Sequence, residues 1–383
     1  MTAIIDSDMH LYEPRDMWAE HVPATRREHA LRISDDELGH AWLMLGDRRV
    51  HLAEVHHPGD VSRMGAYRRL VRAGLPAPSG YDEALPPAFW DPAVRREQLD
   101  GFGLAGTVLF PNYGLIWERS LRDDLEATRL NLSAWNRWAV EVAAEGRGRL
   151  HPVGHVTLRD VDWLHAELHS LSAGGVRLAM VAPALVEGRR LSHPGLDPAW
   201  SAFEQHGVSP VFHVAAFPAR PFDDAWYEND PDQVTPVLSS SFLSTAPALA
   251  VADMAVNGAF QRHPELRLGI MELTAQWVPL FLRHLDGAFA FHAAFEGRPL
   301  CDLPMRPSEY IARQVRVAAF PDEQPARLID EAGDLFMFCS DYPHAEGSVR
   351  PVEDYAEAGS AVRGRSRDLL YGGNIRWLLH DES

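Results

Sequence analysis

Lysine is absent from this sequence, and all 36 basic residues are arginine. A lysine side chain can form a Schiff base or, once carbamylated, bridge two metal ions. Arginine stays protonated at working pH and cannot replace lysine in either role. Both kinds of chemistry are therefore excluded, whereas imidazole chemistry is well supplied, because the chain has 19 histidines.

Cysteine and long apolar runs are also scarce. The two cysteines, Cys301 and Cys339, cannot build a disulfide framework, which agrees with a reducing compartment. No run of about 18 apolar residues suggests a membrane span. The N-terminal segment MTAIIDSD lacks the basic flank and the apolar core of a signal peptide. We therefore expect a cytoplasmic protein.

Positive charge is in deficit, since the net charge is −18 at pH 7. Nucleic acids and anionic membranes bind proteins through a positive field, so neither is expected as a partner. Local arginines still suit a small anionic substrate. The apolar fraction of 46% is enough for a large core, and we expect the 383 residues to form a single domain.

Strand-like apolar segments alternate with helical patterns along most of the chain. Long helical patterns cover about 121–144 and 246–262. Eight alternating β/α units predict an α/β fold, a (β/α)8 barrel of the TIM type. The strand segments are expected at 3–6, 106–111, 150–158, 176–183, 208–214, 266–272, 315–320 and 335–340.

Residues of about 15–100 interrupt this alternation. They are rich in Pro, Gly, Arg and His and predict an insertion after the first strand that caps the barrel mouth. A second irregular stretch, 215–236, is expected to form another wall. Aromatic residues gather in these regions and predict a largely apolar pocket for a bulky organic substrate. They are Phe89, Trp90, Tyr113, Trp117, Phe217, Phe222, Trp226 and Tyr227.

Ligand-type residues stand where the predicted strands end. In the first strand, Asp6, Asp8 and His10 alternate along one face. Each such residue alone has a simpler interpretation as a loop hydrogen-bonding group, but four strands that each deliver one are not expected by chance. The mixture of imidazole and carboxylate suits Zn, Mn or Fe. The residues expected to converge at this rim are Asp8, His10, His213, Glu272 and Asp341, with His344 on the following turn.

Four motifs carry a resemblance to a known family. They are DSDMHLYEP at the first strand, VFHV at the fifth, RHPELRLGIMEL at the sixth and CSDYPH at the eighth. Over nearly its whole length the chain resembles the amidohydrolase-related family, in the branch of aminocarboxymuconate semialdehyde and γ-resorcylate decarboxylases. The resemblance implies a TIM-type barrel, a homodimer, and a divalent metal held by Asp8, His10, His213 and Asp341.

Three positions depart from the pattern of that family. Asp8 stands where many relatives have histidine or glutamate, and His344 has no counterpart in several decarboxylases. Glu272 stands where the decarboxylases place a proton-donating histidine. The mechanism of those enzymes therefore does not transfer to this chain as a simple copy.

The predicted rim holds more ligand-type groups than one ion needs. Two ions about 3.5–4 Å apart require a bridging anion, and without lysine the bridge is Asp, Glu or a solvent oxygen. Further ligands come into reach if the insertion folds over the mouth, namely Glu13, His56 and His57. The simpler alternatives are that Glu272 orients a ligand, that Glu13 begins the cap, that His56 and His57 are solvated, and that His344 stabilises its turn.

Two functions follow from these readings. The chain is similar to members of the family with the pattern DxHxxEP…SDYPH that are dinuclear oxygenases. We therefore expect a dinuclear non-heme iron, or iron–manganese, monooxygenase that hydroxylates a bulky, largely apolar substrate. The alternative is a mononuclear zinc or manganese hydrolase, or a non-oxidative decarboxylase, acting on a small organic acid. The expected catalytic residues are Asp341 as the base, with Glu272 or an imidazole such as His344 as the donor.

Overall fold

The computed structural model describes residues 3–218, 237, 240–300, 302–358 and 361–381. Within these residues, one parallel sheet of eight strands has the order β1-β5-β6-β7-β8-β9-β10-β11. Every strand overlaps a segment expected from the sequence, although β1 continues five residues beyond the expected 3–6, and the (β/α)8 prediction is confirmed. The strands are β1 Ile5–Leu11, β5 Gly106–Pro111, β6 Leu150–His155, β7 Leu178–Met180, β8 Ser209–Phe212, β9 Leu268–Ile270, β10 Val315–Ala319 and β11 Phe336–Phe338.

The barrel closes between its first strand and the residues that follow its last one. The amide of Asp341 donates to the carbonyl of Asp8 at 2.8 Å, and the amide of His10 donates to the carbonyl of Tyr342 at 2.8 Å. The hydroxyl of Ser7 donates to the carbonyl of Phe338 at 2.8 Å. This seam places two ligand-bearing segments side by side, although they lie at opposite ends of the sequence.

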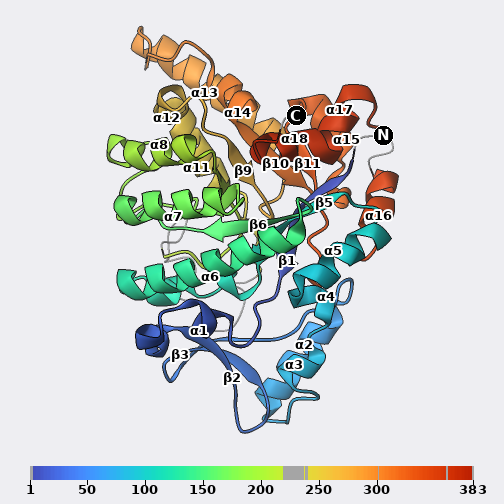
Figure 1. Ribbon diagram of the computed structural model, residues 1–383. Coiled ribbons are helices and arrows are strands. Elements are labelled where there is room, and N and C mark those ends of the chain that lie inside the picture. Colours follow the sequence, from blue (N-terminus) through green and yellow to red (C-terminus); the bar gives the residue numbers. More distant parts are fainter. Residues whose placement is uncertain (1–2, 219–236, 238–239, 301, 359–360, 382–383) are drawn as a thin grey trace.

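Helices cover the outside of the sheet (Figure 1). They include α6 Leu125–Gly146, α7 Val161–Ala173, α8 Asp197–His206, α11 Thr245–Val256, α14 Pro307–Gln314 and α15 Pro325–Ala332. On α7, Leu164, Leu168 and Leu171 are buried at helical spacing and face the sheet. The helix expected at 246–262 is divided, because Gly258 adopts a left-handed backbone with φ of 78° before α12 Ala259–Arg262.

The predicted insertion lies between β1 and β5. It contains an antiparallel sheet of β2 Leu31–Asp35, β3 Ala41–Leu45 and β4 Arg48–Leu52. Short helices α1 Met17–His21, α3 Tyr81–Ala84 and α4 Pro87–Trp90 accompany the 13-residue helix α2 Val61–Ala73. Helix α5 Pro92–Gly101 packs on β5 and α6 as a barrel helix does, so the insertion ends shortly before the predicted boundary.

The second predicted wall, 215–236, lies largely outside the described residues. Phe222, Trp226 and Tyr227 are among the residues that lie outside it. Among the described residues, no helix combines the length and the apolar character that a membrane crossing needs.

Candidate metal centre

Ligand-type side chains from four strands meet at the C-terminal end of the barrel. They come from β1 and from the residues that follow β8, β9 and β11. Their ligand atoms form two groups that share His10, and within each group all atoms lie within 4.8 Å of one another. One group is His10, Glu272, Asp341 and His344, and the other is Asp8, His10 and His213.

His10 lies at the centre of this cluster. Its Nε2 atom is 3.1 Å from Oδ1 of Asp341, 3.6 Å from Oδ1 of Asp8 and 3.8 Å from Oε2 of Glu272. Nε2 of His213 lies 3.4 Å from Oδ1 of Asp8 and 3.2 Å from Oε2 of Glu272. Ligands of a tetrahedral ion with bonds of about 2.1 Å stand roughly 3.3 Å apart, so the spacing suits a shared cation.

Backbone carbonyls fix the direction of both central imidazoles. Nδ1 of His10 lies 3.2 Å from the carbonyl of Pro111, and Nδ1 of His213 lies 2.8 Å from the carbonyl of Val214. A carbonyl only accepts, so each Nδ1 carries the proton and each Nε2 directs a lone pair into the cluster. This is the arrangement that metal-binding histidines require.

The converging atoms lack hydrogen-bond partners of suitable geometry within the described residues. They are both carboxylate oxygens of Asp8, both of Asp341, Oε2 of Glu272, and Nε2 of His10 and of His213, all of them buried. Unpaired polar atoms are costly when they are buried, and charged ones more so. A divalent cation supplies the missing partner for the whole set, so these residues fit a metal.

The pKa values of these side chains are shifted by the same burial and by the charged groups crowded around them. Burial first, and then the charge of Asp341, raise the pKa of Glu272 well above its usual value. Burial and then Asp8 raise the pKa of Asp341 in the same way. Burial, followed by the nearby His344 and His213, lowers the pKa of His10. For His213, burial acts downward, but Asp8 and Glu272 outweigh it and raise the pKa. A cation would relieve the repulsion among the carboxylates and use the lone pairs of neutral imidazoles.

Two of the carboxylate residues have unusual backbone conformations. Asp341 has a φ of 56° and Glu272 a φ of 49°, in the left-handed region that non-glycine residues rarely occupy. Such strain persists where the surroundings fix the chain, and it is concentrated at functional sites. At Asp341 the surroundings are tight, because a Cβ atom on Gly347 would lie 2.5 Å from the carbonyl oxygen of Asp341.

His344 lies against the buried ligands and also reaches a cavity. Its Nδ1 atom is 2.9 Å from Oδ1 of Asp341, and its ring stacks on His10 with centroids 3.7 Å apart. Nε2 of His344 lies 3.1 Å from Oδ1 of Asn112. The sequence did not single out Asn112, which follows β5 inside an otherwise apolar segment and gives no pattern of its own.

The structure does not bring Glu13 into the cluster. Its two carboxylate oxygens accept the backbone amides of Tyr113, at 2.9 Å, and Gly114, at 2.7 Å. Both oxygens are therefore occupied, and the residue holds the loop after β5 in place. The prediction of Glu13 as a metal ligand does not fit this arrangement. Burial raises its pKa to about 7, against those two amide hydrogen bonds.

His56 and His57 also lie outside both groups of ligand atoms. His56 lines the cavity next to His344, with ring centroids 5.2 Å apart. Burial, then His344 and Arg68, lower the pKa of His56 to about 3, so its imidazole is neutral. His57 lines a different cavity, between α2 and the small sheet of the insertion. Neither prediction of a metal ligand agrees with these positions.

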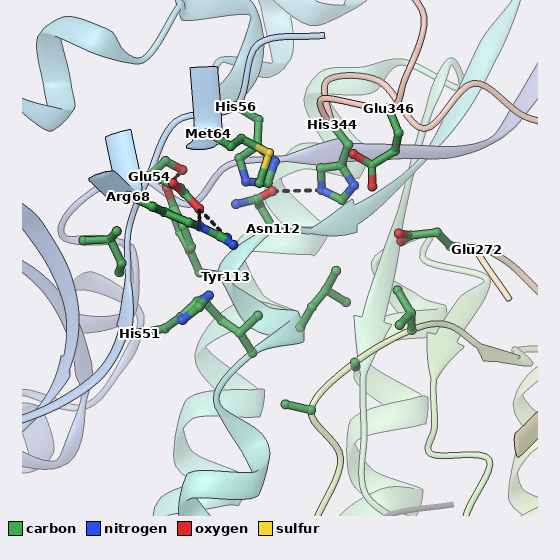
Figure 2. A pocket seen from close by; sticks show the side chains of 16 residues that line it. His51, Glu54, His56, Met64, Arg68, Asn112, Tyr113, Glu272, His344 and Glu346 are labelled. Atoms are coloured by element: carbon green, nitrogen blue, oxygen red, sulfur yellow. Dashed lines mark hydrogen bonds and ion pairs between the residues drawn. The ribbon is translucent and has the colours of Figure 1, made fainter. Parts of the chain in front are cut away.

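A cavity of about 300 Å³ separates the cluster from the insertion. Glu272, His344 and Glu346 line its barrel side, whereas Asp8, His10, His213 and Asp341 lie fully buried behind them. Figure 2 shows Glu272 and Glu346 towards one side of the cavity and His51, Glu54 and Arg68 towards the other, with His56 next to His344. Residues of the insertion therefore line the cavity together with residues of the barrel mouth.

Five of the eight aromatic residues that suggested the pocket are described by the structure, and one of these five lines the cavity. Tyr113 lines the cavity, but Phe89, Trp117 and Phe217 are buried in packing and Trp90 is partly exposed elsewhere. On the cap side, Leu52 and Met64 stand beside histidine, arginine and glutamate, and the barrel side adds Leu115, Ile116 and Val214. The lining is therefore largely apolar with several ionisable groups, although few of the predicted aromatic residues contribute to it.

Comparisons with known proteins agree with this geometry. A family model described as Amidohydrolase matches residues 123–379. No curated protein matches the sequence.

Several solved structures have a similar fold. An amidohydrolase from Mycobacterium avium subsp. paratuberculosis is 24% identical, with a TM-score of 0.78 and 99% of each chain covered. The IDCase of Metarhizium anisopliae is 17% identical, with a TM-score of 0.67 and coverage of 100% of this chain and 98% of that one. A 5-carboxyvanillate decarboxylase from Novosphingobium aromaticivorans, complexed with manganese and a nitrobenzoic acid, is 16% identical, with a TM-score of 0.59 and coverage of 85% and 94%.

The family model spans most of the barrel, from the residues before α6 to the last helix, including the sites of His213, Glu272, Asp341 and His344. The first strand, with Asp8 and His10, lies outside the matched range and joins the cluster through the barrel seam. On this evidence the chain belongs to the amidohydrolase family.

Proposed function

We propose that the protein is a metal-dependent enzyme that decarboxylates or hydrolyses a small organic acid without an oxidant. The observation that carries the proposal is the position of the orphaned ligand atoms directly behind a cavity lined by ionisable and apolar side chains. Asp8, His10, His213 and Asp341 would hold one divalent ion. Glu272 and His344 stand between them and the substrate space.

The ion, when bound, supplies Lewis-acid chemistry, either by polarising a substrate oxygen or by lowering the pKa of a water. Manganese and zinc both suit a set of two imidazoles and two carboxylates. Manganese has further support from the solved decarboxylase that carries it.

Side chains of the protein carry out the proton transfers of the proposed reaction. Asp341 is the base, and His344, 2.9 Å from its Oδ1 atom, passes the proton between this buried carboxylate and the cavity. Glu272 has a side chain that is 16% exposed, on the cavity side of the cluster. From there it reaches the reacting carbon and delivers a proton to the product.

The cap side of the cavity supports an acid as the substrate. Arg68 is the cationic group among the described residues that line it, because burial lowers the pKa of both His51 and His56. Arg68 donates from Nε and Nη2 to Oε1 of Glu54, at 2.9 and 2.6 Å, which fixes its guanidinium at the cavity wall. A second anionic or hydroxyl group on the substrate would bind here, away from the metal.

A dinuclear oxygenase is the second candidate. It is favoured by the two overlapping groups of ligand atoms and by the three carboxylates they contain. We place it second because the relatives named above are amidohydrolases and decarboxylases. The homodimer, the cytoplasmic location and the preference for small molecules over nucleic acids and membranes remain predictions.

Metal content and oxygen dependence test the proposal together. The protein is purified without chelator, analysed for metals, and assayed under argon against a panel of small aromatic and unsaturated carboxylic acids. The expected result is about one manganese or zinc ion per chain and release of CO2 or hydrolysis product without oxygen. Two iron ions per chain, with substrate-dependent oxygen uptake, would overturn it in favour of the oxygenase.

A further inference from the structure

Asp6 is a buried acid that the proposed chemistry does not use. It lies on β1, fully buried, two residues before Asp8. The alternation along the strand suggested that Asp6 shares a face with Asp8 and His10. The pairing of β1 with β5 shifts register between Asp6 and Met9, however, and Asp6 is absent from both groups of ligand atoms.

The hydrogen bonds of Asp6 go to two backbone amides. Its Oδ1 atom accepts the amide of Asp8 at 3.0 Å and the amide of Ser340 at 3.1 Å. The first belongs to a proposed metal ligand, and the second belongs to the residue that precedes another, Asp341. One carboxylate oxygen therefore joins the two ligand-bearing segments across the barrel seam.

The same two segments are also joined directly. The amide of Asp341 donates to the carbonyl of Asp8 at 2.8 Å. Asp341 needs such support, because its φ of 56° is strained for a residue with a side chain. Asp6 accepts the amide of Ser340, and the carbonyl of Asp8 accepts the amide of Asp341. These two consecutive hydrogen bonds hold Asp341 in its strained conformation.

A simple ion-pair role for Asp6 does not account for this geometry. The nearby Arg95 is fully buried, and Tyr342 and Asp6 act to raise its pKa while burial lowers it to about 10. The Nε atom of Arg95 donates to the carbonyl of Ala88, and its guanidinium lies over the ring of Tyr342 at 4.9 Å. No direct hydrogen bond joins Arg95 to Asp6 among the described residues.

We infer that Asp6 is a positioning residue for the metal centre, which sets the distance between the carboxylates of Asp8 and Asp341 by holding the Asp8 and Ser340 amides on one oxygen. The inference rests on the proposed metal site. Groups that orient metal ligands typically change metal affinity about 10–100-fold when they are removed.

Metal affinity without turnover tests this inference. Chelator-stripped wild type, Asp6→Ala and Asp6→Asn are titrated with Mn²⁺ and with Zn²⁺, and Kd is measured by calorimetry or chelator competition. Asp6→Ala removes the acceptor, so its Kd is expected to rise about 10–100-fold. Asp6→Asn keeps an amide oxygen that accepts both hydrogen bonds, so its Kd is expected to stay within a few-fold of wild type.

Ser7→Ala is the matched control. It removes a buried hydrogen bond across the same seam, to Phe338, but touches neither ligand amide. It is expected to lower the melting temperature and leave Kd unchanged. If Asp6→Ala does not fold, Asp6→Ser replaces it, since a hydroxyl one bond shorter cannot hold both amides.

Three results would overturn the inference. The first is a Kd equal to that of wild type in Asp6→Ala or its replacement Asp6→Ser. The others are a Kd in Asp6→Asn as weak as in Asp6→Ala, and a loss of affinity in Ser7→Ala equal to that in Asp6→Ala. Failure of the proposed metal site itself is distinguishable, because the wild type would then bind neither ion, and failure of the proposed reaction appears in the oxygen-dependence assay and leaves these Kd values unchanged.

Discussion

Nδ1 of His344 lies 2.9 Å from Oδ1 of Asp341, and this contact is the route from the buried carboxylates to the cavity. Asp341 is fully buried and touches no cavity wall, whereas His344 lines the cavity and reaches Asn112 with its other nitrogen. On the proposed function, the pair would separate two tasks, metal binding at Asp341 and proton exchange at His344.

Replacement of His344 tests that division. We expect His344→Ala to lower kcat about 10²–10⁴-fold, the usual contribution of a positioned acid or base, and to leave metal content unchanged. Asn112→Ala, which removes only the hydrogen bond to the ring, should have a smaller effect. Loss of the metal in His344→Ala would instead make His344 a ligand.

Glu272→Gln distinguishes one ion from two. Because Glu272 faces the cavity, we expect the variant to keep about one ion per chain, as in wild type, with a strongly reduced kcat. Elemental analysis and steady-state kinetics measure both quantities. A fall from two ions to one would identify Glu272 as a bridging ligand and support the dinuclear centre.

Removal of the metal should leave the carboxylates of the cluster to repel one another without a cation between them, which destabilises the fold. Burial and Asp8 raise the pKa of Asp341 in the fold, so above the pKa of the unfolded chain its charge lowers the free energy of unfolding. We expect chelator-treated Asp341→Asn to melt at a higher temperature than chelator-treated wild type.

Added metal should change the melting temperature of wild type and of Asp341→Asn by different amounts. Ion at 100 times Kd should stabilise wild type by about 2.7 kcal/mol, whereas Asp341→Asn should gain little. Thermal melts with and without Mn²⁺ give the comparison. Equal stabilisation of the two proteins would remove Asp341 from the ligand set.

Arg68 should act on substrate binding and not on chemistry. Its guanidinium is held at the cavity wall by Glu54. Hydrogen bonds to a charged group contribute about 1.5–3 kcal/mol, so Arg68→Met should raise KM about tenfold or more, with kcat little changed. Arg69→Met is the control, because Arg69 lies exposed on the same helix and does not line the cavity. An unchanged KM would place the substrate acid elsewhere.

His151 should lower the stability of the metal-free fold in acid, opposite in sign to the buried acids whose pKa is raised. Burial is the largest cause that lowers its pKa to about 4, whereas histidine in an unfolded chain titrates near 6.5. Between these values the unfolded state binds more protons, so the contribution of His151 to the free energy of unfolding is fully present above pH 6.5 and declines as the pH drops.

His151→Gln should make this decline shallower by about 1–2 kcal/mol between pH 7 and 5. Urea unfolding at several pH values measures it, with His29→Gln as the control, because His29 is exposed. A decline as steep as in wild type would exclude His151 as the cause.

The strands of the barrel were predictable because parallel strands buried on both faces appear as uninterrupted apolar runs. The exception is β1, where the apolar run ends at Asp6 but the strand continues to Leu11 with Asp8 and His10 fully buried. Hydrophobicity cannot mark a strand whose buried residues are polar.

The roles of individual acids were harder to predict than their location. Glu13 and Asp6 lie beside true cluster residues in the sequence, yet their oxygens hold backbone amides. Only the path of the chain decides which carboxylate faces the cation space. The aromatic residues misled for a similar reason, because composition does not distinguish a residue that lines a cavity from one that packs behind it.

The seam between the two ends of the chain has a consequence for biosynthesis. Asp6 and Ser340 are 334 positions apart in the sequence, so the site is assembled by one of the most distant contacts that the polypeptide can make. Such contacts form slowly. A nascent chain that has not yet reached Asp341 thus carries three of the four proposed ligands, and on the proposed site tight capture of the ion must wait until the segment around Ser340 has been synthesised.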